Sequence, residues 1–274
     1  MFALETENPE GVVPYLTQYE PFVTEPTEET VFHLRLSKAP AVTEGFVMEV
    51  NQEDEGQSIR AGHLGEKPCF KFYLQNQLMA VLISNPDYKY AQVYAKDYNL
   101  FGINNALMVM YALSTAEKQT ALFHSSVVSY KGKAYMFLGV SGTGKSTHSS
   151  LWLKYIEGTE LVNDDNPVVR VHEDGSIILY GSPWSGKTPC YRNVSYPLGA
   201  IVALSQAPKN VIRPLKPIEA YIALVESISG KRWDSKLAEG LHHTENLLVT
   251  NAKVWHLDCL PDEEAARVCC ETIS

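Results

Sequence analysis

The chain has 274 residues and a formal net charge of −9, with 45% hydrophobic and 20% charged residues. This length allows one large or two modest domains, and the composition suits a folded globular protein. A negatively charged chain has no general attraction to nucleic acid or anionic lipid, and no apolar run approaches the roughly 18 residues of a membrane-spanning helix. We therefore expect no nucleic-acid partner and no membrane partner.

The cysteines and the first residues of the chain indicate the cellular compartment of the protein. The five cysteines are scattered and form no Cys-x-x-Cys pair, which argues against a disulfide scaffold or a zinc site. The first residues lack the basic start and apolar stretch of a signal peptide. Together these features predict a cytoplasmic protein.

The first hundred residues predict a small β-rich lobe of unknown role. Residues 1–30 are rich in Glu, Thr and Pro, which predicts a partly ordered arm. Short alternating runs then predict an antiparallel arrangement of strands. These runs cover residues 31–36, 46–50, 69–74 and 91–94.

A helix with a broad apolar face is predicted over residues 101–118, leading into the second half of the chain. The predicted domain boundary therefore lies near residue 100. It divides residues 1–100, the N-terminal lobe, from residues 101–274.

Two apolar runs, residues 122–128 and 134–138, predict a hairpin that turns at Lys131-Gly132. In such a hairpin His124 lies at the outer end of its strand, beside the loop that follows residue 138. The residues alone leave both a structural and a functional role open for His124.

The next stretch matches the P-loop (Walker A) pattern G-x-x-x-x-G-K-[ST]. Its glycines let the backbone turn successive N–H groups inward, and a following helix would direct its positive end to the same point. Lys145 can reach the β- and γ-phosphates of a nucleotide, and the Ser146 hydroxyl can bind Mg²⁺. An apolar run before the loop and an amphipathic stretch over 147–156 predict a strand and a helix on its two sides. The candidate nucleotide contacts are Gly139, Val140, Ser141, Gly142, Thr143, Gly144, Lys145, Ser146 and Thr147.

A short apolar run then ends in Asp164-Asp165. Beside a phosphate loop, one carboxylate can hold Mg²⁺ and the other can accept the proton of an attacking hydroxyl. An Asx-rich turn is the alternative reading. The glycine loop about 20 residues upstream favours the site, and which of the two acids serves as base stays open.

A second glycine loop, residues 181–187, follows a predicted hairpin over 168–180. Trp184, which we expect to be exposed, is a candidate contact to phosphate or to an acidic substrate, as are Lys187 and Arg192. A plain turn with solvated charges fits equally well. Beyond it the patterns predict further strands and helices. They cover strand 198–204, helix 217–229, helix 236–248, strand 254–260 and a terminal helix from residue 261.

The order of these motifs over residues 105–260 resembles the HPr kinase/phosphorylase-like family. The resemblance rests on His124, the glycine loop 139–147, Val162-Asn163-Asp164-Asp165 and Gly181-Ser182-Pro183-Trp184. That family shares its P-loop with phosphoenolpyruvate carboxykinase (PEPCK). The resemblance implies an α/β fold, α+β overall, with a C-terminal PEPCK/HPr-kinase-like P-loop domain of mixed sheet and flanking helices behind the β-rich lobe.

The resemblance also implies a function. It implies an ATP- and Mg²⁺-dependent kinase that phosphorylates a hydroxyl of a protein, a peptide or a small molecule, working as a cytoplasmic homo-oligomer. Lys145 and Ser146 would serve the phosphates and Mg²⁺, and Asp164 would assist the metal. Asp165 would be the base, and His124 a partner of the reacting phosphate. The stretch 178–182 lacks the acid and arginine of HPr kinase proper, which argues against HPr as the acceptor.

Two other functions fit the same motifs. A PEPCK-like enzyme would share the glycine loop and the acid pair, but only 138 residues precede the loop, too few for the usual substrate lobe of that enzyme. A non-catalytic ATP-binding regulator would need the loop alone, so the acid pair and the histidine argue against it.

Overall fold

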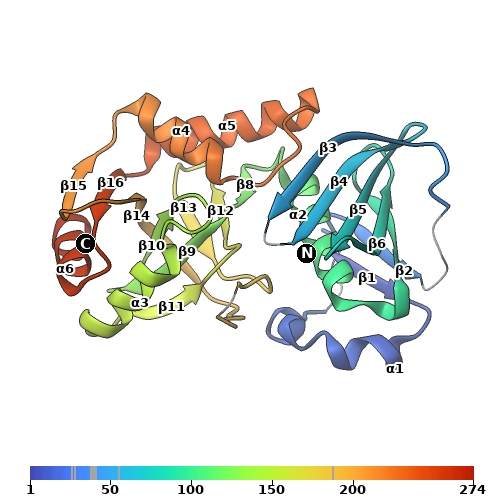
Figure 1. Cartoon of the computed structure of the whole chain (residues 1–274), viewed down its shortest axis with the longest axis horizontal. Helices are drawn as coiled ribbons and strands as arrows, with labels where there is room; N and C mark the ends of the chain where they lie inside the picture. The colour runs from blue at the N-terminus through green and yellow to red at the C-terminus, as the bar shows by residue number, and fades with distance from the viewer. Residues whose placement is uncertain (26, 28, 38–41, 55, 187) are drawn as a thin grey trace. The chain divides into compact units, whose positions relative to one another are not determined.

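The computed structural model describes the chain except for residues 26, 28, 38–41, 55 and 187. The chain divides into two compact units, Met1–Thr115 and Ala116–Ser274. Each unit is built on its own mixed β-sheet (Figure 1), which gives the mixed α/β architecture expected. Among the described residues, no helix is long and apolar enough to cross a bilayer.

The first unit is a seven-stranded sheet in the order β1-β2-β7-β6-β5-β4-β3. β1 pairs in parallel with β2, and β2 in parallel with β7, whereas the remaining neighbours are antiparallel. The prediction of an antiparallel lobe was therefore wrong for this edge of the sheet. The strands are β1 (Ala3–Thr6), β2 (His33–Ser37), β3 (Phe46–Asp54), β4 (Gln57–Leu64), β5 (Lys67–Leu74), β6 (Gln77–Ser84) and β7 (Tyr90–Ala95).

Residues 3–22 are folded rather than part of the predicted partly ordered arm, whereas the described residues from 23 to 30 form no helix or strand. After β1 the chain forms α1 (Pro9–Val12) and the 3₁₀ helices η1 (Val13–Tyr15) and η2 (Thr17–Phe22). The Asn104 side-chain oxygen accepts hydrogen bonds from Gln18 Nε2 at 2.8 Å and from the Tyr19 hydroxyl at 3.1 Å. These long-range contacts order a segment whose composition carries little local signal.

Helix α2 (Leu100–Thr115) belongs to the first unit, so the boundary lies at residue 115 rather than near residue 100. The helix packs on β5, β6 and β7. Gly102 allows the close approach, because a Cβ at that position would lie 2.3 Å from Ala80 Cβ. A short 3₁₀ helix, η3 (Lys96–Tyr98), connects β7 to it.

In the second unit, β10 lies between β9, its antiparallel partner, and β14, its parallel partner, and β14 continues in parallel to β16. β11 lies beyond β9, on the side of β10 away from β14. The strands are β8 (Thr120–Leu122), β9 (Ser125–Tyr130), β10 (Lys133–Leu138), β11 (Glu160–Asn163), β12 (Val168–Val171), β13 (Ile177–Tyr180), β14 (Ser195–Gln206), β15 (Val211–Pro214) and β16 (Val254–Cys259).

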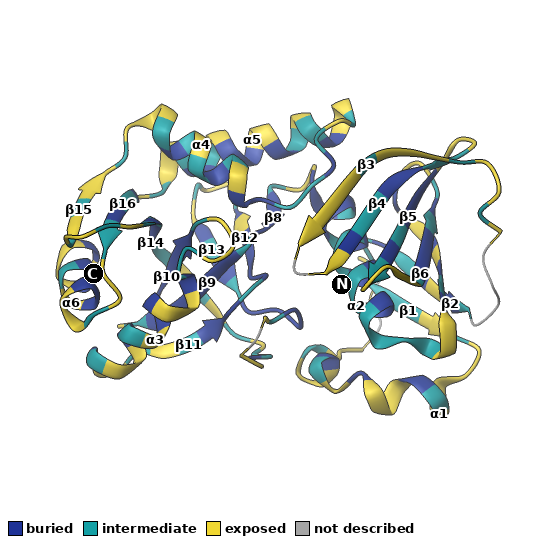
Figure 2. Cartoon of the chain, viewed as in Figure 1, coloured by how far each residue is buried: buried dark blue, intermediate teal, exposed yellow. Residues whose placement is uncertain are grey.

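Helices cover both faces of this sheet (Figure 1). On one face Trp152 of α3 packs against Tyr135 and Phe137 of β10, in a core shared with α6. Strand β10 is buried from Ala134 to Leu138, which agrees with its continuous apolar run. The middle of the sheet is coloured mainly as buried (Figure 2). The helices are α3 (Lys145–Tyr155), α4 (Pro217–Ser227), α5 (Ser235–Asn251) and α6 (Glu263–Ile273).

Local signals account for most of these elements. The β9–β10 turn places Lys131 and Gly132 at φ of 48° and 74°, as a tight hairpin of right-twisted strands requires. Pro217 begins α4, and Asp234 and Asp262 cap α5 and α6 by accepting a backbone hydrogen bond. The predicted hairpins, helices and strands of this half are confirmed, except that the run 122–128 divides between β8 and β9. His124 therefore lies in the bend between these two strands rather than at the end of one strand.

Candidate functional site

The glycine loop connects β10 to α3, so the predicted order of strand, loop and helix is confirmed. Gly139, Gly142 and Gly144 have φ of 152°, 81° and 107°, a region that favours glycine. A Cβ on Gly139 would also lie 2.9 Å from the Thr143 side chain. Gly144, the N-cap of α3, has no side chain with which to cap the helix, and the first N–H groups of an α-helix point outward from its start. This geometry suits an anion.

Two side chains stabilise the loop. Lys145 Nζ donates to the carbonyl oxygens of Gly139 at 2.9 Å and Val140 at 3.3 Å, which holds the buried ammonium inside the loop. Gln206, at the end of β14, donates from Nε2 to the carbonyl oxygens of Gly142 at 3.1 Å and Thr143 at 3.4 Å. The loop is therefore tied to the neighbouring parallel strand as well as to its own lysine.

Asp164 is a buried carboxylate connected to the helix that follows the loop. Ser126 Oγ donates to Asp164 Oδ1 at 2.7 Å and lies 2.6 Å from Ser149 Oγ. Because the Ser126 hydrogen goes to the carboxylate, Ser149 must donate to Ser126. Ser149 lies on α3, one turn after Ser146. This chain of hydroxyls fixes Asp164 relative to the helix that begins at Lys145.

Asp165 faces His124. Its Oδ1 lies 3.1 Å from His124 Nδ1, and both side chains are partly exposed. The Asp165 backbone is held on both sides, since its N–H donates to Asn163 Oδ1 at 2.9 Å and its carbonyl accepts from Ser125 N at 2.9 Å. The two adjacent acids thus take different partners, and the structure brings Asp165 and His124 together.

The second glycine loop packs on the acid pair. The buried Ser182 hydroxyl donates to the Asn166 carbonyl at 2.6 Å, and Asn163 Nδ2 donates to Ser182 Oγ at 3.1 Å. A Cβ on Gly186 would lie 2.8 Å from the Asp164 carbonyl oxygen and 3.3 Å from Asp165 Cβ. The loop therefore positions the acids through its backbone.

The three candidate contacts on or shortly after this loop lie in different surroundings. Trp184 is only 6% exposed, so its expected exposure was wrong, because the ring is buried in the core. Arg192 donates to the Leu161 carbonyl at 2.6 Å and to Glu160 Oε2 at 2.7 Å, on β11. The hydrogen bond with Glu160 raises the pKa of Arg192. Lys187 lies outside the described residues.

Several positioning residues carry no signal in the sequence. A serine in a strand or helix looks like any other, and its partner becomes visible only when distant segments meet. Asn163 and Ser182 are the exceptions, because both stand in motifs that carry the family resemblance. The positioning residues are Ser126, Ser149, Asn163, Ser182 and Gln206.

Asp164 is the acid that could contribute to a metal site, because its carboxylate is held in place by the Ser126 hydroxyl. Among the described residues, no three His, Cys, Asp or Glu side chains group closely enough to hold a metal by themselves. Mg²⁺ at phosphate sites typically takes one or two carboxylates and completes its shell with phosphate oxygens and water. A single fixed carboxylate, Asp164, on a hydroxyl chain from α3 suits that use.

Comparisons with known proteins bear on the family and the fold. A family model described as the SynChlorMet cassette protein ScmC matches residues 90–252. The solved HPr(Ser) kinase/phosphatase from Coxiella burnetii is similar over 54% of this chain and 90% of that chain, with 12% identity and a TM-score of 0.31. A TM-score of this size carries no argument about the site. The search of curated proteins gave no match.

Proposed function

The chain belongs to the family of the SynChlorMet cassette protein ScmC, and we propose that its second unit is a kinase that transfers the γ-phosphoryl group of ATP to a hydroxyl. The acceptor hydroxyl belongs to a protein, a peptide or a small molecule. The observation that supports this most is the 3.1 Å contact between Asp165 and His124. Nucleotide binding alone requires neither residue.

Each part of the proposed site has one task. The N–H groups at the start of α3 and Lys145 bind the β- and γ-phosphates. Asp164 and the Ser146 hydroxyl hold Mg²⁺, which when bound neutralises charge on the phosphate oxygens. Lys145 exchanges its two loop carbonyls for phosphate oxygens when the nucleotide binds.

Asp165 accepts the proton of the acceptor hydroxyl as its oxygen attacks the γ-phosphorus. The new O–P bond forms while the bond to the β-phosphate bridging oxygen breaks, and ADP leaves with that electron pair. His124 engages one carboxylate oxygen of Asp165, so the other oxygen is available to the acceptor. The Asn163 side chain and Ser125 hold the Asp165 backbone in this position.

The test compares the parent with Asp165→Asn, using γ-labelled ATP and a lysate of the source organism. We expect the variant to keep Mg-ATP affinity and to lose transfer by about 10²-fold or more, because the amide cannot accept the proton. Asp174→Asn is the matched control, since Asp174 is an exposed aspartate in the turn between β12 and β13. The control should transfer label like the parent.

Three results would contradict the proposal. Transfer by Asp165→Asn at the parent rate would remove the assigned base. Formation of phosphoenolpyruvate from oxaloacetate and ATP, without labelling of any lysate component, would favour the PEPCK-like reaction. Tight Mg-ATP binding without turnover in any mixture would indicate a nucleotide-dependent regulator.

A further inference from the structure

A pocket of about 790 Å³ opens beside the first half of the glycine loop, within the second unit. Loop residues 138–143 form one wall, and the end of β14 and one side of α4 form others. Small-molecule sites typically enclose about 300–1,000 Å³. The pocket is therefore large enough for a nucleoside and is continuous with the proposed phosphate cradle.

The reacting groups lie elsewhere. Asp164, Asp165 and His124 do not line this pocket. The two acids follow β11, on the side of β10 that also carries β9, whereas β14 and β16 lie on the other side. In phosphoryl transfer the attacking and leaving oxygens are roughly in line across the phosphorus. An acceptor near Asp165 thus directs the leaving nucleotide toward β14, where the pocket is.

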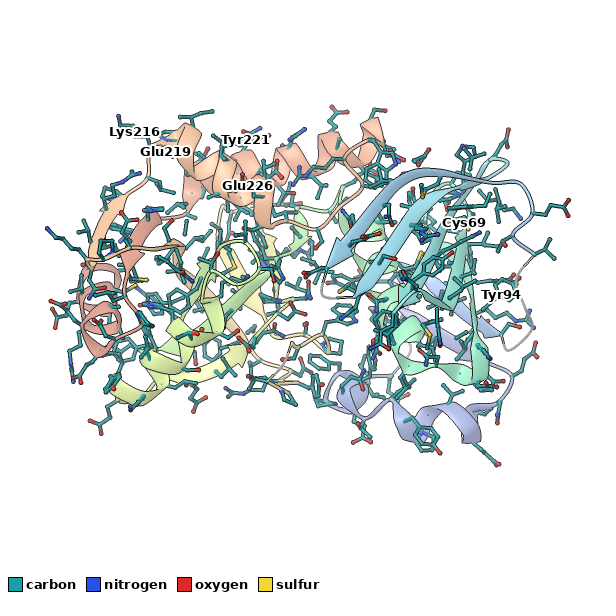
Figure 3. All side chains as sticks on the ribbon, viewed as in Figure 1. Cys69, Tyr94, Lys216, Glu219, Tyr221 and Glu226 are labelled. Carbon is teal, nitrogen blue, oxygen red and sulfur yellow. The ribbon has the colours of Figure 1, made fainter. Side chains whose placement is uncertain are left out.

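The chemistry of the pocket suits a nucleoside better than more phosphate. Val140 on the loop and Ile222 on α4 are 70% and 52% exposed, and both line it. Apolar side chains on two walls can pack on the faces of a flat ring. Glu219 and Glu226, both on α4 (Figure 3), also line the pocket. The Glu219 carboxylate is neutralised by Arg213, which also lines the pocket and donates to both of its oxygens at 3.1 Å. The Glu226 carboxylate can accept hydrogen bonds from sugar hydroxyls and ring amino groups.

We propose that this pocket holds the base and ribose of a purine nucleoside triphosphate whose phosphates lie on the glycine loop. The inference rests on the proposed function, because it assumes that the loop binds the phosphates of the donor. It adds the element that recognises the nucleoside, which no sequence motif indicates.

The test compares Ile222→Asn with Ile218→Asn. Both isoleucines are exposed on α4 one turn apart, but only Ile222 lines the pocket. Calorimetry would measure the affinity of each variant for Mg-ATP, Mg-GTP and Mg-tripolyphosphate. We expect Ile222→Asn to weaken binding of at least one purine nucleotide about fivefold, through lost apolar contact, and to leave tripolyphosphate binding unchanged. Ile218→Asn should change none of the three.

Other outcomes would overturn the inference. An equal loss of nucleotide and tripolyphosphate affinity in Ile222→Asn would mean that the substitution disturbs the glycine loop and removes no contact to the nucleoside. Unchanged nucleotide affinity with a raised KM for the acceptor would make this the acceptor pocket. Equal parent affinities for ATP and tripolyphosphate would show that the nucleoside makes no contact, while the role of the loop stands. If the parent binds none of the three ligands, the proposed function itself fails.

Discussion

Gly186 is a position where a single added methyl group should displace the two acids of the candidate site. Its Cβ would lie 2.8 Å from the Asp164 carbonyl oxygen, whereas ordinary contact begins at 3.4 Å. The difference, 3.4 minus 2.8, requires the second glycine loop and the acid turn to separate by about 0.6 Å. The carbonyl is backbone, so no flexible side chain can absorb this shift.

The displacement acts directly on the proposed base. Asp165 would move with Asp164, and its 3.1 Å contact with His124 would approach or pass the limit of a hydrogen bond. A misplacement of about 1 Å in an active site can reduce the rate 10²-fold. Because the shift here is smaller, we expect kcat of Gly186→Ala to fall about tenfold. Overpacking should also lower the free energy of unfolding by about 1–3 kcal/mol.

The assay is kcat for label transfer, together with Mg-ATP affinity and a urea unfolding curve. We expect kcat to fall while nucleotide affinity stays near that of the parent, because the glycine loop is untouched. Ser185→Ala is the control in the same loop, since it removes one exposed hydrogen bond to the Thr188 carbonyl without adding bulk. A Gly186→Ala variant with parental kcat and stability would refute the reasoning.

Two further predictions concern buried polar groups. Ser126→Ala and Ser149→Ala should each lower the unfolding free energy by about 1–2 kcal/mol, and a double-mutant cycle should give a coupling of about 0.5–1 kcal/mol, since both act through one chain to Asp164. Ser126→Ala should also weaken the Mg²⁺ dependence of nucleotide binding in calorimetry, and strictly additive losses would contradict the chain. Burial lowers the pKa of His148 from 6.5 to about 4, so below pH 6.5 the unfolded chain takes up a proton that the folded protein refuses. Stability from this group is complete above pH 6.5 and is lost as the pH falls toward 4, by about 2 kcal/mol between pH 7 and pH 5. Denaturant unfolding should show a smaller pH loss in His148→Gln, and an equal loss in both proteins would refute this.

The sequence by itself determined the features whose cause is local. The glycine spacing predicted the strand, loop and helix at residues 134–156, because only glycine adopts the positive φ at residues 139, 142 and 144 without strain. Lys131-Gly132 predicted the hairpin that brings His124 to the same end of the sheet. The acid pair was recognisable because it follows a short buried strand.

The tertiary structure decided everything that depends on contacts between distant segments. The pairing of β1 with β2 and the packing of α2 on the first sheet carry no local pattern, so the predicted arm and the boundary near residue 100 did not anticipate them. In the same way, a serine such as Ser126 becomes a positioning residue only when its hydroxyl meets a carboxylate 38 positions away. Trp184 looked exposed beside glycine and proline, but the long-range packing of its loop on the acid turn buries it. Local backbone preferences can be read from adjacent residues, whereas the partner of a polar side chain is set by which strands become neighbours.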